Sequence, residues 1–202
     1  MQEKTSEGIT GIILTGGNAS RMGENKALKK LEGETLIERT AKILSRSVDQ
    51  IILITNSPEE FSFLNLPMYP DIAKGIGPLA GILTGLTHSP TELNILMACD
   101  LPFITSEAID HLLKMRGTSG LVAYRTEKGI ETFCAIYSKK LIAEIQNRIQ
   151  KKNYEIHTLF NEPDAKLIPF NSQLPFYHPD LFFNVNSPED FKKAQDFLNI
   201  KK

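Results

Sequence analysis

The 202-residue chain has no tryptophan, two cysteines and almost no excess charge, since 23 Lys and Arg face 24 Asp and Glu. A net charge of −1 argues against a nucleic-acid-binding protein, which normally needs a broad basic face. Cys99 and Cys134 have neither metal-ligand nor redox spacing, so we expect a reducing, cytoplasmic setting. No apolar run approaches the ~20 residues of a membrane span. The polar residues 1–8 are unlike a signal peptide, and we expect no membrane partner.

Apolar runs alternate with helical patterns along the chain, and hydrophobic residues make up 41% of it, enough for one folded domain. The alternation predicts an α/β fold with a mostly parallel sheet and right-handed crossovers. We see no linker or repeat, so a single domain is expected over residues 1–202, with residues 1–8 as a polar tail. Strands are expected at residues 9–14, 50–55 and 93–98, and helices at residues 35–47, 78–88 and 105–115.

The second half of the chain is less regular. Residues 121–125 and 131–137 predict a hairpin, and a helix opened by Ser138 is expected to follow. Residues 161–181 contain four prolines and are expected to be irregular. Ser187, Pro188 and Asp190 have the positions of an N-cap, a first helical residue and a capping-box partner, so a final helix should begin there.

A glycine-rich loop follows the first expected strand. Residues 14–26 read Leu-Thr-Gly-Gly-Asn-Ala-Ser-Arg-Met-Gly-Glu-Asn-Lys. Glycines such as Gly16 and Gly17 let the backbone approach a ligand, and successive N–H groups form an anion-binding concavity. Arg21 and Lys26 add cations that can reach phosphate oxygens. The spacing fits neither a P-loop nor a dinucleotide-binding motif. We predict a triphosphate-binding loop; the alternative is a plain glycine turn with two solvated cations.

Polar residues follow other expected strands. Asp100 comes after an apolar strand, and ligands bind at the carboxyl ends of strands in an open parallel sheet. A carboxylate there suits Mg²⁺; the alternatives are a cap for the helix near Thr105 and a residue that merely turns the chain. Asn56 and Asp71 also follow expected strands and could hydrogen-bond a base or ribose, although each alone is more often a turn former.

Three further features could bear on the site. Residues 75–81 are glycine-rich and allow either close approach of a nucleoside or tight helix packing. Asn184 and Asn186 alternate at the end of an expected short strand, so both amides should face one side. They would then complete a metal shell or hold an acceptor phosphate, unless they serve turn chemistry. Cys99 lacks a neighbouring base and is interpreted as a buried apolar residue.

Taken together, these motifs resemble the nucleotidyltransferases of molybdenum cofactor maturation, chiefly the molybdenum cofactor guanylyltransferases. The resemblance runs from Gly8 to Phe191. The glycine-rich motif is shared with many NTP transferases that activate sugars and alditols, so it indicates only the superfamily. The guanylyltransferases are indicated by the combination of Gly-Pro-Leu-Ala-Gly at 77–81 with Phe-Asn-Val-Asn-Ser-Pro-Glu-Asp at 183–190.

The resemblance implies a three-layer α/β/α, Rossmann-like nucleotidyltransferase fold. It implies transfer of GMP from GTP to the terminal phosphate of molybdopterin, with Mg²⁺ as cofactor and pyrophosphate as product. Molybdoenzyme apoproteins or other maturation proteins are further implied partners. Asp100 would ligate Mg²⁺ and the nucleotide, and Asn184 and Asn186 would face the acceptor. The nucleotide-binding residues would be Leu14, Thr15, Gly16, Gly17, Lys26, Asn56, Asp71 and Asp100.

The implied chemistry is in-line attack by an ionised phosphate oxygen, which needs positioning and charge neutralisation but no general base. Lys26, Arg21 and Mg²⁺ on Asp100 would supply the positive charge. Two departures stand out: Thr15 replaces the usual alanine, and the segment at Glu131 lacks a common proline, which bears on acceptor recognition. Alternatives are a molybdopterin cytidylyltransferase, a sugar-phosphate nucleotidyltransferase, and a non-catalytic GTP-binding cofactor chaperone.

Overall fold

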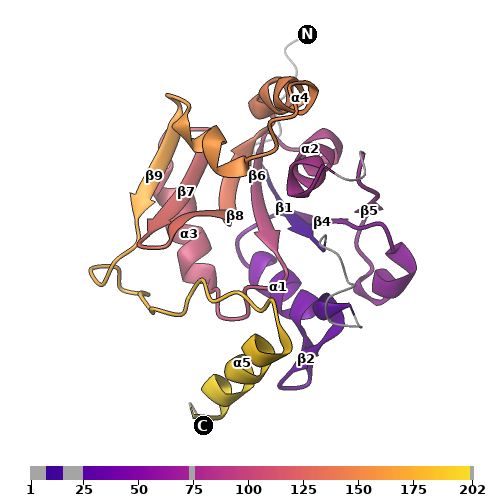
Figure 1. Ribbon diagram of the computed structural model, residues 1–202, viewed down its shortest axis with the longest axis vertical. Coiled ribbons are helices and arrows are strands. Elements are labelled where there is room, and N and C mark those ends of the chain that lie inside the picture. Colours follow the sequence, from indigo (N-terminus) through magenta and orange to yellow (C-terminus); the bar gives the residue numbers. More distant parts are fainter. Residues whose placement is uncertain (1–7, 16–24, 73–75, 201–202) are drawn as a thin grey trace.

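A central sheet of seven strands organises the computed structural model, which describes residues 8–15, 25–72 and 76–200. The strand order is β5-β4-β1-β6-β8-β7-β9 (Figure 1). Only β8 runs antiparallel to its neighbours, β6 and β7, so the sheet is mostly parallel, as predicted. The bounds are β1 (Ile9–Leu14), β4 (Gln50–Ile54), β5 (Met68–Tyr69), β6 (Leu93–Ala98), β7 (Leu121–Thr126), β8 (Gly129–Ser138) and β9 (Ala165–Pro169).

Helices cover both faces of the sheet, which gives the predicted three layers (Figure 1). Successive strand residues point to opposite faces, so Ile13 packs with the layer of α1 and α3 while Ile12 packs with the layer of α2 and α4. The C-terminal α5 packs beside α1 through a separate small cluster that includes Leu36 and Ala194. The bounds are α1 (Leu36–Leu44), α2 (Pro78–His88), α3 (Ser106–Met115), α4 (Ile142–Gln150) and α5 (Pro188–Ile200).

Among the described residues, no helix combines the length and apolar character needed to cross a membrane.

Strand β9 corrects one expectation. It lies inside the proline-containing stretch that we expected to be irregular, and it pairs in parallel with β7, from Leu121 with Ala165 to Arg125 with Pro169. Proline cannot donate to a ladder, but an edge strand tolerates it, and β9 is the edge strand here. The prolines therefore limit the length of this strand and do not prevent it from forming.

Short elements that the sequence did not predict connect β1 to α1. They are the 3-10 turn η2 (Lys26–Leu28) and the antiparallel hairpin of β2 (Lys30–Leu31) and β3 (Glu34–Thr35). A second correction concerns Ser138, which caps the 3-10 turn η4 (Lys139–Leu141) rather than α4 itself. Two further 3-10 segments are η3 (Pro58–Leu64) and η5 (Ile156–Asn161).

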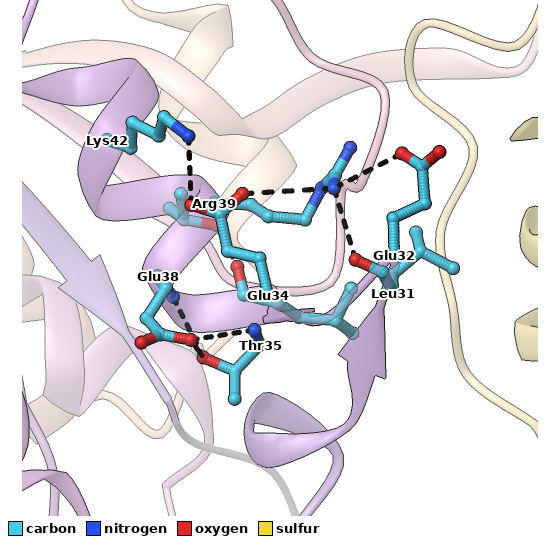
Figure 2. Close-up of polar contacts among 9 residues, drawn as sticks. Leu31, Glu32, Glu34, Thr35, Glu38, Arg39 and Lys42 are labelled. Atoms are coloured by element: carbon cyan, nitrogen blue, oxygen red, sulfur yellow. Dashed lines mark hydrogen bonds and ion pairs between the residues drawn. The ribbon is translucent and has the colours of Figure 1, made fainter.

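Arg39 on α1 holds this hairpin in place (Figure 2). Its Nη1 donates to the Leu31 carbonyl oxygen at 3.2 Å and lies 3.8 and 3.9 Å from the Glu32 and Glu34 carboxylates. A guanidinium can serve several acceptors at once because its donors are fixed in one plane. Arg39 thereby fixes the hairpin on α1.

The start of α1 is fixed as well. The Thr35 hydroxyl accepts from the Glu38 N–H at 3.2 Å, and the Glu38 carboxylate accepts from the Thr35 N–H at 2.8 Å, which is a capping box (Figure 2). The Leu36 N–H also donates to the Lys29 carbonyl oxygen at 3.1 Å. The backbone that carries Lys26 is therefore tied to α1 on its C-terminal side.

Candidate active site at the carboxyl edge of the sheet

The carboxyl ends of β1, β4 and β6 meet at one edge of the sheet. The chain leaves β1 between β4 on one side and β6 on the other, which is the topological switch point where α/β sheets bind ligands. Thr15, Asn56 and Asp100 follow these three strands within two residues. Gly16, Gly17 and Arg21 of the predicted phosphate loop lie outside the described residues.

Lys26, Asp100 and Asn186 meet at this edge, although they come from η2, the loop after β6 and the segment before α5. The Lys26 Nζ donates to Asp100 Oδ2 at 2.5 Å and to Asn186 Oδ1 at 3.1 Å. The Asp100 side chain is 11% exposed and that of Lys26 is 23% exposed. The helix-capping alternative for Asp100 is wrong, because the N-cap of α3 is Thr105.

Asp100 also keeps an oxygen available. Its Oδ1 is buried and has no hydrogen-bond partner among the described residues, and a buried polar atom of this kind normally has one. No cluster of three or more His, Cys, Asp or Glu side chains suited to a metal occurs in the described part of the chain. Mg²⁺ in nucleotide sites is commonly held by one or two carboxylates plus substrate phosphates. The lone Asp100 carboxylate fits that arrangement.

The segment before α5 corrects the expected short strand. Residues 183–186 belong to neither a strand nor a helix. Their donors have other partners: the Val185 N–H donates to the Asp100 carbonyl oxygen at 2.9 Å, and the Asn186 N–H donates to Asp190 Oδ2 at 3.2 Å. Asn186 reaches Lys26, whereas the Asn184 Oδ1 is buried without a partner among the described residues. The segment is thus attached to the Asp100 loop, not to the sheet.

Asn56 and Asp71 contact each other at the ends of β4 and β5. The Asn56 Nδ2 donates to Asp71 Oδ2 at 3.2 Å, and the Asp71 N–H donates to Asn56 Oδ1 at 3.1 Å. Burial raises the pKa of Asp71, and the hydrogen bond from Asn56 opposes that shift. A Cβ at Gly81 would lie 3.3 Å from Asp71 Oδ1 and 3.1 Å from Leu14 Cδ2. Gly81 thus lets α2 approach both candidate residues closely.

Thr15, directly after β1, is bonded to the neighbouring strand β4. Its N–H and its Oγ1 both donate to the Ile54 carbonyl oxygen, at 3.2 and 3.0 Å. An alanine would keep the first bond and lose the second. The threonine found here therefore adds a side-chain anchor and leaves the backbone path of β1 unchanged.

Cys99, beside Asp100, is a buried thiol. Burial, together with the negative charge of Asp100, raises the pKa of Cys99 to about 12. The thiolate is the nucleophilic form of cysteine, and at neutral pH this side chain is protonated. Cys99 therefore contributes apolar packing here and no nucleophile.

Glu131 is a half-buried carboxyl group that the sequence analysis noted only for a missing proline. The last pair between β6 and β8 joins Met97 to Cys134, so Glu131 extends past the end of β6 on the ligand-binding edge. Burial raises the pKa of Glu131, while the Thr126 hydroxyl, which donates at 3.3 Å, opposes the shift. The charged form is thus disfavoured by the fold.

We expect Glu131→Gln to raise the melting temperature at pH 7.5. An acid whose pKa is raised on folding binds its proton more tightly in the folded state, so stability falls as pH rises through the folded pKa. Glutamine removes that penalty and can still accept from Thr126. The advantage should vanish below about pH 4, where glutamate is protonated in both states. Thermal melts across pH test this, with the exposed Glu127→Gln as control; a pH-independent difference would contradict it.

The fold and this edge define a Rossmann-like nucleotide-binding protein, and comparison with known proteins narrows the class. Residues 11–165 match the model of the MobA-like NTP transferase domain. A probable molybdenum cofactor guanylyltransferase of Peptoclostridium acidaminophilum is 33% identical over 200 residues, covering 95% of this chain and 90% of the relative. One of Carboxydothermus hydrogenoformans is 32% identical, covering 96% and 99%.

Solved structures agree on the fold. The molybdopterin-guanine dinucleotide biosynthesis protein A of Archaeoglobus fulgidus superposes with a TM-score of 0.76 at 23% identity, over 95% of this chain and 99% of that one. A putative protein of Aquifex aeolicus gives a TM-score of 0.74 at 27% identity, over 88% and 93%. The chain belongs to the MobA-like NTP transferase family.

Proposed function

We propose that this protein transfers GMP from GTP to the terminal phosphate of molybdopterin and releases pyrophosphate. The observation that carries the proposal is the meeting of Lys26, Asp100 and Asn186 at the switch point of the sheet. The names of the relatives supply the substrate pair, and the family supplies the reaction class. GTP and molybdopterin are then the small-molecule partners. Molybdoenzyme apoproteins or other maturation proteins are the protein partners to which the product is delivered.

The mechanism needs one bond made and one broken. An oxygen of the acceptor phosphate forms a bond to the α-phosphorus, and the bond from that phosphorus to the bridging oxygen of pyrophosphate breaks. Lys26 holds phosphate oxygens and, with Arg21, neutralises the charge that develops on them. Mg²⁺ on Asp100 would supply further charge neutralisation at the phosphates when bound. The attacking phosphate is already ionised, so no side chain has to remove a proton.

The remaining candidate residues take binding roles in this proposal. Leu14, Thr15, Gly16 and Gly17 line the nucleotide along the loop after β1. The Asn56–Asp71 pair holds the guanosine part, where an amide and a carboxylate offer both donors and acceptors. Asn184 and Asn186 face the acceptor. We place the whole reaction in one domain spanning residues 1–202, in a reducing cytoplasm that suits the two buried thiols.

An anaerobic assay tests the proposal directly. The protein is incubated with Mg²⁺, molybdopterin with molybdate, and either GTP or CTP; pyrophosphate is quantified and the product is weighed by mass spectrometry. A guanine dinucleotide from GTP, with CTP inert, is the expected result. A cytosine product would reassign the protein as a cytidylyltransferase. Tight GTP binding without pyrophosphate release would overturn the enzymatic proposal in favour of a cofactor chaperone.

In the same assay, Lys26→Ala should reduce turnover by about 10²-fold or more, since it removes a preorganised cation from the reacting phosphates. Lys30→Ala, on the exposed surface of the β2–β3 hairpin, is the matched control and should retain full activity. Initial rates at saturating GTP separate loss of turnover from loss of binding. Near-normal turnover of folded Lys26→Ala would remove Lys26 from the mechanism.

A further inference from the structure

A positive charge already lies on Asp100. The Lys26 ammonium contacts Oδ2 at 2.5 Å, so one oxygen of the candidate metal ligand is engaged while the other, Oδ1, has no partner among the described residues. The Asn186 Oδ1 accepts a second hydrogen bond from the same ammonium at 3.1 Å. Lys26, which would bind phosphates, is therefore held beside Asp100, the candidate metal ligand, by two hydrogen-bond acceptors.

A divalent ion and this ammonium cannot share Asp100 without cost. Both oxygens belong to one carboxyl group, so an ion on Oδ1 would lie a few ångströms from the Lys26 charge. The Asp100 side chain is 11% exposed, and partly buried like charges repel more strongly than charges in bulk water. Lys26 in this position therefore opposes the binding of a free metal ion.

We propose that Lys26 acts as an internal cation that keeps free divalent ions off Asp100 until a nucleotide triphosphate draws the ammonium away. The inference rests on the proposed function for the identity of Asp100 as the metal ligand. A triphosphate offers the ammonium several charged oxygen acceptors, whereas Asp100 offers a single carboxylate. Once Lys26 has moved to the triphosphate, Asp100 is left with its negative charge exposed to the incoming metal–nucleotide complex.

The local structure allows this exchange without a change of fold. The backbone of η2 is held by the hairpin and by buried Ala27, whereas the Lys26 side chain is partly exposed. Rotation of the side chain about its own bonds is enough to move the ammonium. Metal and nucleotide then bind with positive coupling, and each raises the affinity for the other by the same factor.

The test measures Mn²⁺ binding without nucleotide, by the electron paramagnetic resonance signal of the free ion. Lys26→Met should bind one Mn²⁺ about tenfold more tightly than the unmodified protein, because the competing charge is gone. Lys26→Gln, which keeps a donor without charge, should behave in the same way. Lys26→Arg keeps the charge and should bind no more tightly than the unmodified protein. Lys30→Met is the surface control and should show no change.

The location of the gained ion is tested by a double variant. Adding Asp100→Asn to Lys26→Met should remove the gain, since the ion is expected on that carboxylate. Equal or weaker Mn²⁺ binding by both neutral Lys26 variants, or a gain that survives Asp100→Asn, would overturn the inference. Circular dichroism melts establish that each variant is folded. No nucleotide enters this experiment, so its result is separate from that of the dinucleotide assay.

Discussion

Replacing Asp100 with asparagine is expected to lower the rate of pyrophosphate release by about 10³-fold or more. The substitution keeps the size of the side chain and removes the charge that would hold Mg²⁺ against the triphosphate. It also leaves the Lys26 ammonium without its anionic partner at 2.5 Å. The measurement is the rate of pyrophosphate formation at saturating GTP and molybdopterin, with product identity checked by mass spectrometry.

The control for this variant is Asp110→Asn. Asp110 is an exposed carboxylate on α3, bonded to the Ser47 hydroxyl at 2.6 Å, and its neutralisation should leave turnover unchanged. Both variants should remain folded at the assay temperature. Retention of more than a tenth of normal turnover by Asp100→Asn would show that the reaction proceeds without this carboxylate.

Gly85→Ala is expected to destabilise the fold, although a glycine-to-alanine change inside a helix ordinarily stabilises it. A Cβ at Gly85 would lie 2.5 Å from Ile12 Cγ2, well inside the ~3.5–4 Å of a normal carbon–carbon contact. Overpacking typically costs 1–3 kcal/mol, and the better helix propensity of alanine returns about 1 kcal/mol. A net loss of up to about 2 kcal/mol should lower the melting temperature by up to roughly 8 °C.

Gly81→Ala, one turn earlier in α2, is the matched control. Its Cβ would lie 3.1 Å from Leu14 Cδ2 and 3.3 Å from Asp71 Oδ1, both at the ends of side chains and both longer than the contact at Gly85, so the melting temperature should change less. Shortening Ile12 to alanine should abolish the effect of Gly85→Ala in a double-mutant cycle. Additive losses in that cycle would place the origin of the effect elsewhere in α2.

The sheet was predictable from the sequence wherever its strands are covered on both faces. β1, β4 and β6 are short continuous apolar runs, because each face of the parallel sheet packs against a helical layer. Strand β9 was hidden, since Pro169 ends it and sequence patterns treat proline as a breaker. Its position at the edge of the sheet, where a missing N–H has no cost, is a property of the fold and not of the local sequence.

The candidate site was predictable residue by residue but not as an arrangement. Lys26, Asp100 and Asn186 each stand in a recognisable motif, yet their contacts span 74 and 160 residues. The short strand expected at Asn184 and Asn186 did not form, since the Val185 N–H donates to the Asp100 carbonyl oxygen and not to a strand. Local patterns specify where a chain turns; they carry no information about which distant carbonyl group accepts from it.

The attachment of the segment before α5 to Asp100 has a consequence for the order in which the protein folds. Every strand of the sheet lies before residue 170, so the sheet can form without the segment that carries Asn186. Contacts between distant parts of a chain generally form late because loop closure must precede them. The candidate site would then form in two stages, with the contact between Lys26 and Asp100 made first and the Asn186 amide added afterwards.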